Sequence, residues 1–327
     1  MYKLMTQQLR HFSRTTPRQI TPTAAAWTTK QSSEQKIYVS KALEGWDEKL
    51  RSNGVGDIDF NLKCIVAKVL QRKFNTLKTY HDVQFNQDQL QEFERLCEAR
   101  CARMPLQHIV GEWDFMDITL KTSPTVFIPR PETEEFVSKV INIYRNYKEP
   151  LDMLEVGCGS GAMSLAILHA LPNIKSTAVE RSKAATALAW ENAKMLNLQD
   201  RFVVYNHTTA ENDYLPKELE GRKFDLIISN PPYVKSEEFP LLQPEVKLYE
   251  NLNALDGGPD GLRIARLVFD CACIHLKPGG KMWLELGNDH PPLVQTIIDL
   301  QYEGRLRFIS GYEDQYKRNR FVEIEKV

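Results

Sequence analysis

Four consecutive residues, Asn230-Pro231-Pro232-Tyr233, carry groups suited to chemistry on a planar nitrogen. They follow the apolar run Phe224–Ser229, which has the length of a buried strand, and parallel sheets bind ligands at the carboxyl ends of such strands. Prolines have no N–H group and hold the backbone in a fixed conformation, so their carbonyls and the Asn230 amide can face a substrate. The tetrapeptide therefore predicts a cradle for an NH2 group, although by itself it is also compatible with an ordinary proline turn.

A second group with binding chemistry is the glycine-rich stretch that begins at Glu155. Its glycines allow a tight turn in which the backbone approaches a ligand closely. Glu180 follows at the end of the next predicted strand, where a carboxylate can accept hydrogen bonds from both hydroxyls of a ribose. The pattern indicates an adenosine-type ligand. The residues expected to contact it are Glu155, Gly157, Cys158, Gly159, Ser160, Gly161 and Glu180.

Two adenosine cofactors are compatible with a glycine-rich turn after a strand. The phosphate-binding motif of nicotinamide enzymes, G-x-G-x-x-G, would require a third glycine at the position of Ala162. The pattern E-x-G-x-G-x-G, with its acidic residue on the strand, is instead typical of S-adenosylmethionine sites. Glu155 would then lie near the cationic methionine end of S-adenosylmethionine. The remaining interpretation is a purely structural glycine turn.

The elements that must position these residues begin at Leu151, where strand and helix patterns start to alternate. Alternation of this kind predicts an α/β fold with a doubly wound sheet of about seven strands, as in Rossmann-like domains. Only the turn 311–320 separates the last two strands, which predicts an antiparallel hairpin at one edge. Strands are expected at Met153–Val156, Ser176–Val179, Arg201–Tyr205, Phe224–Ser229, Lys281–Leu286, Leu306–Ile309 and Phe321–Ile324, and helices at Ala162–Ala170, Ala184–Leu196, Gly261–His275 and Pro292–Gln301.

The chain before Leu151 has a different organisation. Apolar residues at spacings of three and four predict a small helical domain over 34–105, for which we expect a role in scaffolding or partner docking. Residues 106–128 alternate apolar and polar side chains and are expected to form a hairpin linker. The catalytic domain is expected over 129–327, and its first helix should begin within the proline-stiffened stretch 127–135.

The first 33 residues contain five basic residues and no acidic one. Met5, Leu9 and Phe12 have the spacing that would place them on one face of a helix, and the composition is typical of a mitochondrial presequence rather than of a secretory signal with a long apolar centre. We therefore expect a disordered presequence over 1–33 and a location in the mitochondrial matrix. A tail without function is the alternative.

Composition excludes several other classes. A formal net charge of -1 gives no argument for tight nonspecific binding of nucleic acid, and no apolar run approaches the roughly 18 residues of a membrane-spanning helix. The 6 cysteines have neither the paired spacing of a zinc site nor the density of a disulfide scaffold. We expect reduced thiols, no metal, and neither nucleic acid nor membrane as a direct partner.

Taken together, the glycine-rich stretch and the tetrapeptide resemble class I methyltransferases that act on planar nitrogens. One such class methylates the exocyclic amino group of adenine in DNA or RNA, and the other methylates the side-chain amide of glutamine in proteins. The chain is similar to the HemK/PrmC family, which is of the second class, from about Lys36 to its end. The stretches that carry this similarity are Pro105–Trp113, Ile128–Glu134, Tyr249-Glu250 and Ala254–Gly261.

The resemblance implies a protein-(glutamine-N5) methyltransferase that uses S-adenosylmethionine and supports translation termination. Its substrate would be the glutamine in the Gly-Gly-Gln loop of peptide chain release factors, mitochondrial ones given the leader. Asn230 and the Pro231 carbonyl would accept the two N–H groups of the amide, while Tyr233 would pack on its plane and Pro232 would complete the substrate site. A monomer is expected.

The chain departs from the family pattern beside the adenine. Relatives carry Asp after the third strand, where this chain has Asn206-His207-Thr208-Thr209. Thr208, and Asn230 from the tetrapeptide, are included among the expected cofactor contacts. His207 could hydrogen-bond the base, although a lone histidine is more often satisfied locally. Cofactor contact and a structural role both remain open for Arg130, Glu132 and Thr133. Glu250 and Asp256 are expected to be structural.

Overall fold

The computed structural model describes residues 36–77 and 79–327. The expected presequence over 1–33 and the first two residues of the expected helical domain lie outside the described residues. Among the helices that are described, none is both long and apolar enough to cross a membrane.

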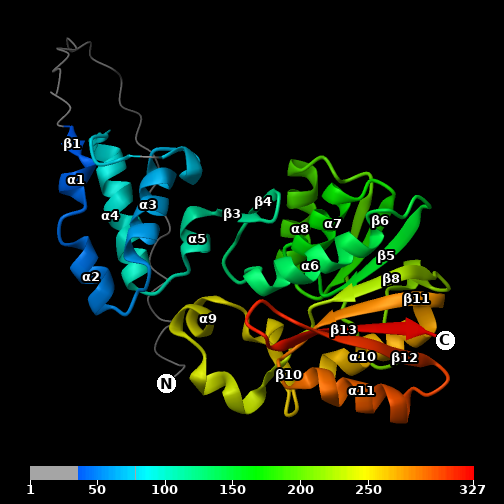
Figure 1. Ribbon diagram of the computed structural model, residues 1–327. Helices are drawn as coiled ribbons and strands as arrows, with labels where there is room; N and C mark the ends of the chain where they lie inside the picture. The colour runs from blue at the N-terminus through cyan, green and yellow to red at the C-terminus, as the bar shows by residue number, and fades with distance from the viewer. Residues whose placement is uncertain (1–35, 78) are drawn as a thin grey trace, which may run out of the picture. The chain divides into compact units, whose positions relative to one another are not determined.

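Seven strands form one sheet in the order β12-β13-β11-β8-β5-β6-β7, which confirms the predicted sheet (Figure 1). β5, β6, β7, β8 and β11 run parallel, whereas β13 is antiparallel to both β11 and β12. The hairpin at the edge is therefore confirmed, with its second strand inserted next to β11. The strands are β5 (Leu151–Val156), β6 (Ile174–Glu180), β7 (Phe202–Asn206), β8 (Phe224–Ser229), β11 (Leu276–Glu285), β12 (Leu306–Glu313) and β13 (Asn319–Lys326).

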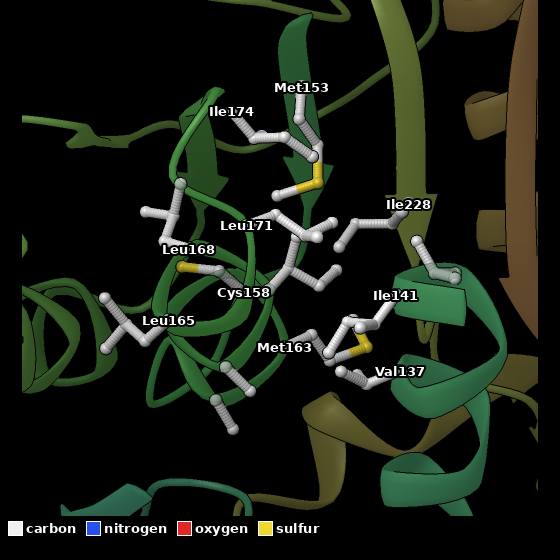
Figure 2. Packing of buried hydrophobic residues seen from close by; sticks show 14 of the residues in the cluster. Val137, Ile141, Met153, Cys158, Met163, Leu165, Leu168, Leu171, Ile174 and Ile228 are labelled. Carbon is white, nitrogen blue, oxygen red and sulfur yellow. The ribbon is translucent and has the colours of Figure 1, made fainter. Parts of the chain in front are cut away.

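Helices cover both faces of this sheet and bury a separate apolar cluster on each. One cluster joins α6, α7 and α8 to β5 and β6, and Figure 2 shows part of it, including Val137, Met153, Met163 and Ile228. The other cluster joins α10 and α11 to the opposite face. Burial on both faces explains why the central strands are almost continuously apolar. These helices are α6 (Pro131–Tyr144), α7 (Ala162–Ala170), α8 (Lys183–Met195), α10 (Arg263–His275) and α11 (His290–Gln301).

The amino-terminal region contains short helices around an apolar cluster of its own. Asn86 begins α4 with a capping box, because its side chain accepts from the backbone of Gln89 and the Gln89 side chain accepts in return. An antiparallel hairpin, β3 with β4, follows. The elements are β1 (Ile37–Tyr38), α1 (Val39–Ala42), α2 (Trp46–Ser52), α3 (Ile58–Val69), η1 (Phe74–Thr76), β2 (Gln84–Phe85), α4 (Gln87–Cys101), α5 (Leu106–Val110), β3 (Glu112–Phe115) and β4 (Ile118–Lys121).

Several short elements that sequence patterns did not predict lie between β8 and α10. One more, η2 (Lys217–Leu219), precedes β8. Glu245 fixes this segment to α4, since its carboxylate accepts from Arg100 at 3.1 Å and from Arg103 at 2.6 Å. The Tyr249 hydroxyl also donates to the Ala102 carbonyl at 2.7 Å. The segment comprises β9 (Val234–Lys235), η3 (Ser236–Leu241), α9 (Pro244–Tyr249), η4 (Leu252–Ala254) and β10 (Asp256–Gly258).

Candidate active site

A pocket opens at the carboxyl ends of β5 and β8, with about 1100 Å³ of empty space that includes the solvent at its mouth. β6 and β7 extend the sheet from one side of β5, whereas β8 lies on its other side, so the strand order reverses here. Doubly wound sheets bind their ligands at such a reversal. The pocket brings the glycine-rich stretch, Glu180 and the first residue of the tetrapeptide, Asn230, to one place.

Gly157 and Gly159 shape the floor of the pocket. Their φ angles are 77° and 55°, a left-handed conformation that other residues rarely adopt, and a side chain built on either glycine would meet no atom within 4 Å. Gly161 has a different role, because a Cβ atom there would lie 3.1 Å from Leu165 and 3.3 Å from Ala189. Gly161 allows α7 to start against α8 and is not among the residues that line the pocket.

Glu180 closes the glycine turn from the end of β6. One carboxylate oxygen accepts from the backbone N–H of Gly159 at 3.0 Å and the other from that of Ser182 at 2.7 Å. Each oxygen has a further lone pair for a ligand hydroxyl. Both Cys158 and Ser160 line the pocket, but the Cys158 side chain packs into the apolar cluster with Leu165 and Leu168, as Figure 2 shows. Cys158 therefore offers its backbone to the pocket.

Glu155 is a fully buried carboxyl group at the pocket wall. One oxygen accepts from the backbone N–H of Ser164 at 3.1 Å and from the Ser164 hydroxyl, whereas the other oxygen has no hydrogen-bond partner in the described part of the chain. Burial raises the pKa of Glu155 to about 8, and the two Ser164 contacts oppose that rise. A cationic group in the pocket would stabilise the ionised form of this carboxyl group.

The tetrapeptide Asn230–Tyr233 follows directly after the last residue of β8. The Asn230 amide donates to the Thr133 hydroxyl at 3.3 Å, which links the tetrapeptide to the first turn of α6. Asn230 and Pro232 line the pocket, whereas Pro231 and Tyr233 do not. The Arg320 guanidinium lies 5.6 Å from the centre of the Tyr233 ring, and burial raises the pKa of the Tyr233 hydroxyl to about 12.

The stretch before α6 contributes more to the pocket than its sequence indicated. Phe127, Pro129 and Thr133 all line the pocket. Arg130 instead donates to the buried Glu250 at 2.5 Å. Only Thr133 was among the sequence candidates, because an apolar residue between turn residues carries no signal that distinguishes a ligand contact from packing. The geometry favours a structural role for Arg130 and a pocket role for Thr133.

The loop after β7 forms another wall of the pocket. His207, Thr208 and Thr209 all line it. The imidazole of His207 lies 3.1 Å from the Asp213 carbonyl, and the Thr209 hydroxyl donates to the Tyr214 carbonyl at 3.2 Å. His207 is thus satisfied locally, while Thr208 is exposed to the pocket.

Comparisons with known proteins agree with this arrangement. Residues 41–111 match the model of the PrmC N-terminal domain, and residues 138–243 match that of the methyltransferase small domain. The chain is 38% identical to the human MTRF1L release factor glutamine methyltransferase over 88% of each chain. It is 32% identical to a release factor glutamine methyltransferase of Fusobacterium nucleatum over 90% of this chain and 84% of that one.

Among solved structures, a release factor-specific protein-(glutamine-N5) methyltransferase from Alicyclobacillus acidocaldarius is 22% identical, with a TM-score of 0.39. The match covers 63% of this chain and 99% of that one. The two curated relatives exceed 30% identity over more than four fifths of their own length and so confirm the resemblance that the sequence motifs indicated. The chain belongs to the family of release factor glutamine methyltransferases.

Proposed function

We propose that this protein transfers a methyl group from S-adenosylmethionine to the side-chain amide nitrogen, N5, of the glutamine in the Gly-Gly-Gln loop of peptide chain release factors, and that its substrates are mitochondrial. The observation that carries the proposal is the position of Asn230, which follows β8 and lines the same pocket as Glu180. An amide-orienting residue and a ribose-binding carboxylate thus lie at one strand-order reversal.

The residues of the pocket fit S-adenosylmethionine. Glu180 presents two oxygens for ribose hydroxyls, and the unpartnered oxygen of Glu155 suits a cationic methionine end. Gly157 and Gly159 leave the space beside their backbone open. We assign Glu155, Gly157, Cys158, Gly159, Ser160, Glu180 and Thr208 to the cofactor site, with Gly161 supporting the turn from behind.

When bound, S-adenosylmethionine supplies an electrophilic methyl group. The chain's own task is to orient a weak nucleophile, because the lone pair of an amide nitrogen is delocalised into its carbonyl group. The Asn230 oxygen and the Pro231 carbonyl accept the two N–H groups and thereby aim the nitrogen lone pair. Tyr233 holds the amide plane from the side. Orientation and electrostatic support replace a strong general base at this site.

A methylation assay tests the proposal. The purified protein is incubated with S-adenosylmethionine that carries a labelled methyl group and, in separate reactions, with a mitochondrial release factor, duplex DNA or structured RNA. Label is expected only on the release factor and is expected to disappear when the glutamine of its Gly-Gly-Gln loop is changed to asparagine. Label on nucleic acid, or label that persists in the altered release factor, would overturn the assignment.

We further propose that residues 34–105 dock the release factor. Glu245 joins Arg100 and Arg103 of this region to the segment that follows the tetrapeptide. Glu245→Ala would leave the buried Arg100 without a counter-charge, a change that costs about 3 kcal/mol. We expect the KM for the release factor to rise at least about tenfold, equivalent to about 1.4 kcal/mol, while the Kd for S-adenosylmethionine stays unchanged.

Steady-state kinetics and calorimetry measure these two constants. Glu237→Ala, which alters an exposed carboxyl group on the same segment, is the matched control and should change neither. An unchanged KM in Glu245→Ala would separate the amino-terminal region from substrate docking.

We also propose a location in the mitochondrial matrix. The basic, acid-free composition of residues 1–33 supports it. A fluorescent reporter that carries these residues at its amino terminus should enter the matrix in cells. A reporter that stays outside mitochondria would contradict the proposed location.

A further inference from the structure

Glu285 is a fully buried carboxyl group that no sequence motif identified. It is the last residue of β11, and its neighbour Leu284 pairs with Ser229, the last residue of β8. Figure 1 shows β8 and β11 side by side. Glu285 therefore lies beside the point at which Asn230 leaves the sheet. Neither of its carboxylate oxygens has a hydrogen-bond partner of normal distance and angle in the described residues.

Two polar side chains nevertheless act on this carboxyl group. The Thr133 hydroxyl and the Asn230 amide both favour its ionised form and so oppose the rise of its pKa. Thr133 is itself buried, and its oxygen already accepts from the Asn230 amide at 3.3 Å. Its hydroxyl hydrogen remains to be donated, and a carboxylate can only accept. A small shift within this cluster would complete a hydrogen bond from Thr133 to Glu285.

Three ionisable side chains from separate segments of the chain act on Glu285. Arg320 on β13 stabilises the carboxylate and Glu132 on α6 destabilises it, while Tyr233 from the tetrapeptide segment faces it as a neutral phenol. Burial is the largest effect, and the pKa of Glu285 is raised to about 7. The Glu285 carboxyl group consequently gains or loses its proton near neutral pH, where the enzyme operates.

We propose that Glu285 is a positioning residue that sets which atom of the Asn230 amide faces the substrate. The ionised carboxylate accepts from the Thr133 hydroxyl, whose oxygen accepts from the Asn230 NH2 group, so the Asn230 oxygen is left to accept an N–H group of the substrate amide. The inference rests on the proposed function, in which Asn230 orients that amide. Glu285 acts only through Thr133 and Asn230.

Protonation of Glu285 would reverse the direction of this hydrogen-bond chain. A protonated carboxyl group can donate to the Thr133 oxygen, and the Thr133 hydroxyl can then donate to the Asn230 oxygen. The Asn230 amide would turn over and present its NH2 group to the NH2 group of the substrate, which is a donor facing a donor. The proposal therefore links the orientation of Asn230 to the charge of Glu285.

Glu285→Gln tests the proposal because it keeps the shape of the side chain, removes the charge, and offers Thr133 an NH2 donor as well as an oxygen acceptor, so that residue 285 no longer fixes the direction of the hydrogen-bond chain. We expect the single-turnover rate of release factor methylation at saturating S-adenosylmethionine to fall about 10- to 100-fold, since small misplacements cost up to about 100-fold. The Kd for S-adenosylmethionine should not change. The wild-type rate should decrease as the pH is lowered through 7, whereas the Glu285→Gln rate should show no such decrease.

Variants at Thr133 serve as matched controls. Thr133→Val removes the hydroxyl and should lose about as much rate as Glu285→Gln, whereas Thr133→Ser keeps the hydroxyl and should be faster than Thr133→Val. The double variant Glu285→Gln/Thr133→Val should be no slower than either single variant, because the residues act as one chain. Thermal unfolding of each variant monitors folding separately.

Either of two results would overturn the inference: a wild-type rate in Glu285→Gln, or a decrease below pH 7 that persists in that variant. Both results require a wild-type protein that methylates the release factor. Absence of methylation by the wild type would instead contradict the proposed function.

Discussion

Asn230→Ala should reduce the methylation rate by at least about 100-fold, equivalent to about 2.7 kcal/mol of transition-state stabilisation. The substitution removes the oxygen that we propose accepts a substrate N–H group, and it removes the amide that donates to Thr133. An amide nitrogen depends on orientation more than most nucleophiles, because its lone pair is delocalised. Single-turnover methylation of a release factor measures the effect, and calorimetry with S-adenosylmethionine should show little change in affinity.

Two further variants sharpen this prediction. Asn230→Asp keeps the shape and the acceptor but loses the amide donor to Thr133, and it brings a second carboxylate close to Glu285. It should therefore be about as slow as Asn230→Ala. Asn319→Ala, at an exposed position on β13, should retain the wild-type rate. A wild-type rate in Asn230→Ala would remove Asn230 from the mechanism.

Glu180→Ala should weaken binding of S-adenosylmethionine by about 30- to 1000-fold. The expected loss corresponds to about 2 to 4 kcal/mol. It lies at or below the roughly 3 to 6 kcal/mol that the two proposed hydrogen bonds from ribose hydroxyls to a charged group would contribute, at about 1.5 to 3 kcal/mol each. The substitution also removes the acceptors of two hydrogen bonds, because the backbone N–H groups of Gly159 and Ser182 donate to the Glu180 carboxylate in the wild type. Calorimetric titration of the folded variant measures the change.

The matched variant Glu180→Gln keeps one acceptor oxygen and should lie between Glu180→Ala and the wild type. Glu218→Gln, an exposed carboxyl group outside the pocket, should bind the cofactor like the wild type. At saturating cofactor the Glu180 variants should recover much of their turnover, since the reacting groups are unchanged. Equal affinity in Glu180→Ala and the wild type would place the ribose elsewhere.

Local sequence patterns predicted most of the catalytic fold. The expected helix Ala162–Ala170 is α7 and the expected strand Phe224–Ser229 is β8, residue for residue. β8 lies in the middle of the sheet and α7 packs on one of its faces, and in both elements burial leaves an apolar run between clear turn residues. The short elements between β8 and α10 were not predicted, because each has too few residues to show a period.

Some residues of the candidate site could likewise be predicted from the sequence, and others could not. Glu155, the glycines, Glu180 and Asn230 could be identified because each belongs to a short pattern: a glycine-rich turn after a strand, an acidic residue at the end of the next strand, or Asn-Pro-Pro-Tyr after a strand. Phe127 and Pro129 could not, since an apolar pocket wall has the same composition as ordinary packing. Glu285 was not identified either, because one acidic residue at a strand end has no distinguishing neighbour in the sequence.

The sequence by itself determined the order of strands and helices, the glycine turn, the position of the Asn-Pro-Pro-Tyr tetrapeptide after β8, and the family resemblance. Each of these depends on residues that are close together in the chain, where type and spacing are sufficient. Only the tertiary structure decided which distant residues share the pocket, and that the NH2 group of Asn230 is the part that hydrogen-bonds to Thr133. Thr133 and Glu285 are separated from Asn230 by many residues, and they meet it because α6 and β11 pack against the end of β8. Contacts of that kind are set by the burial of whole faces of helices and strands, which no local spacing encodes.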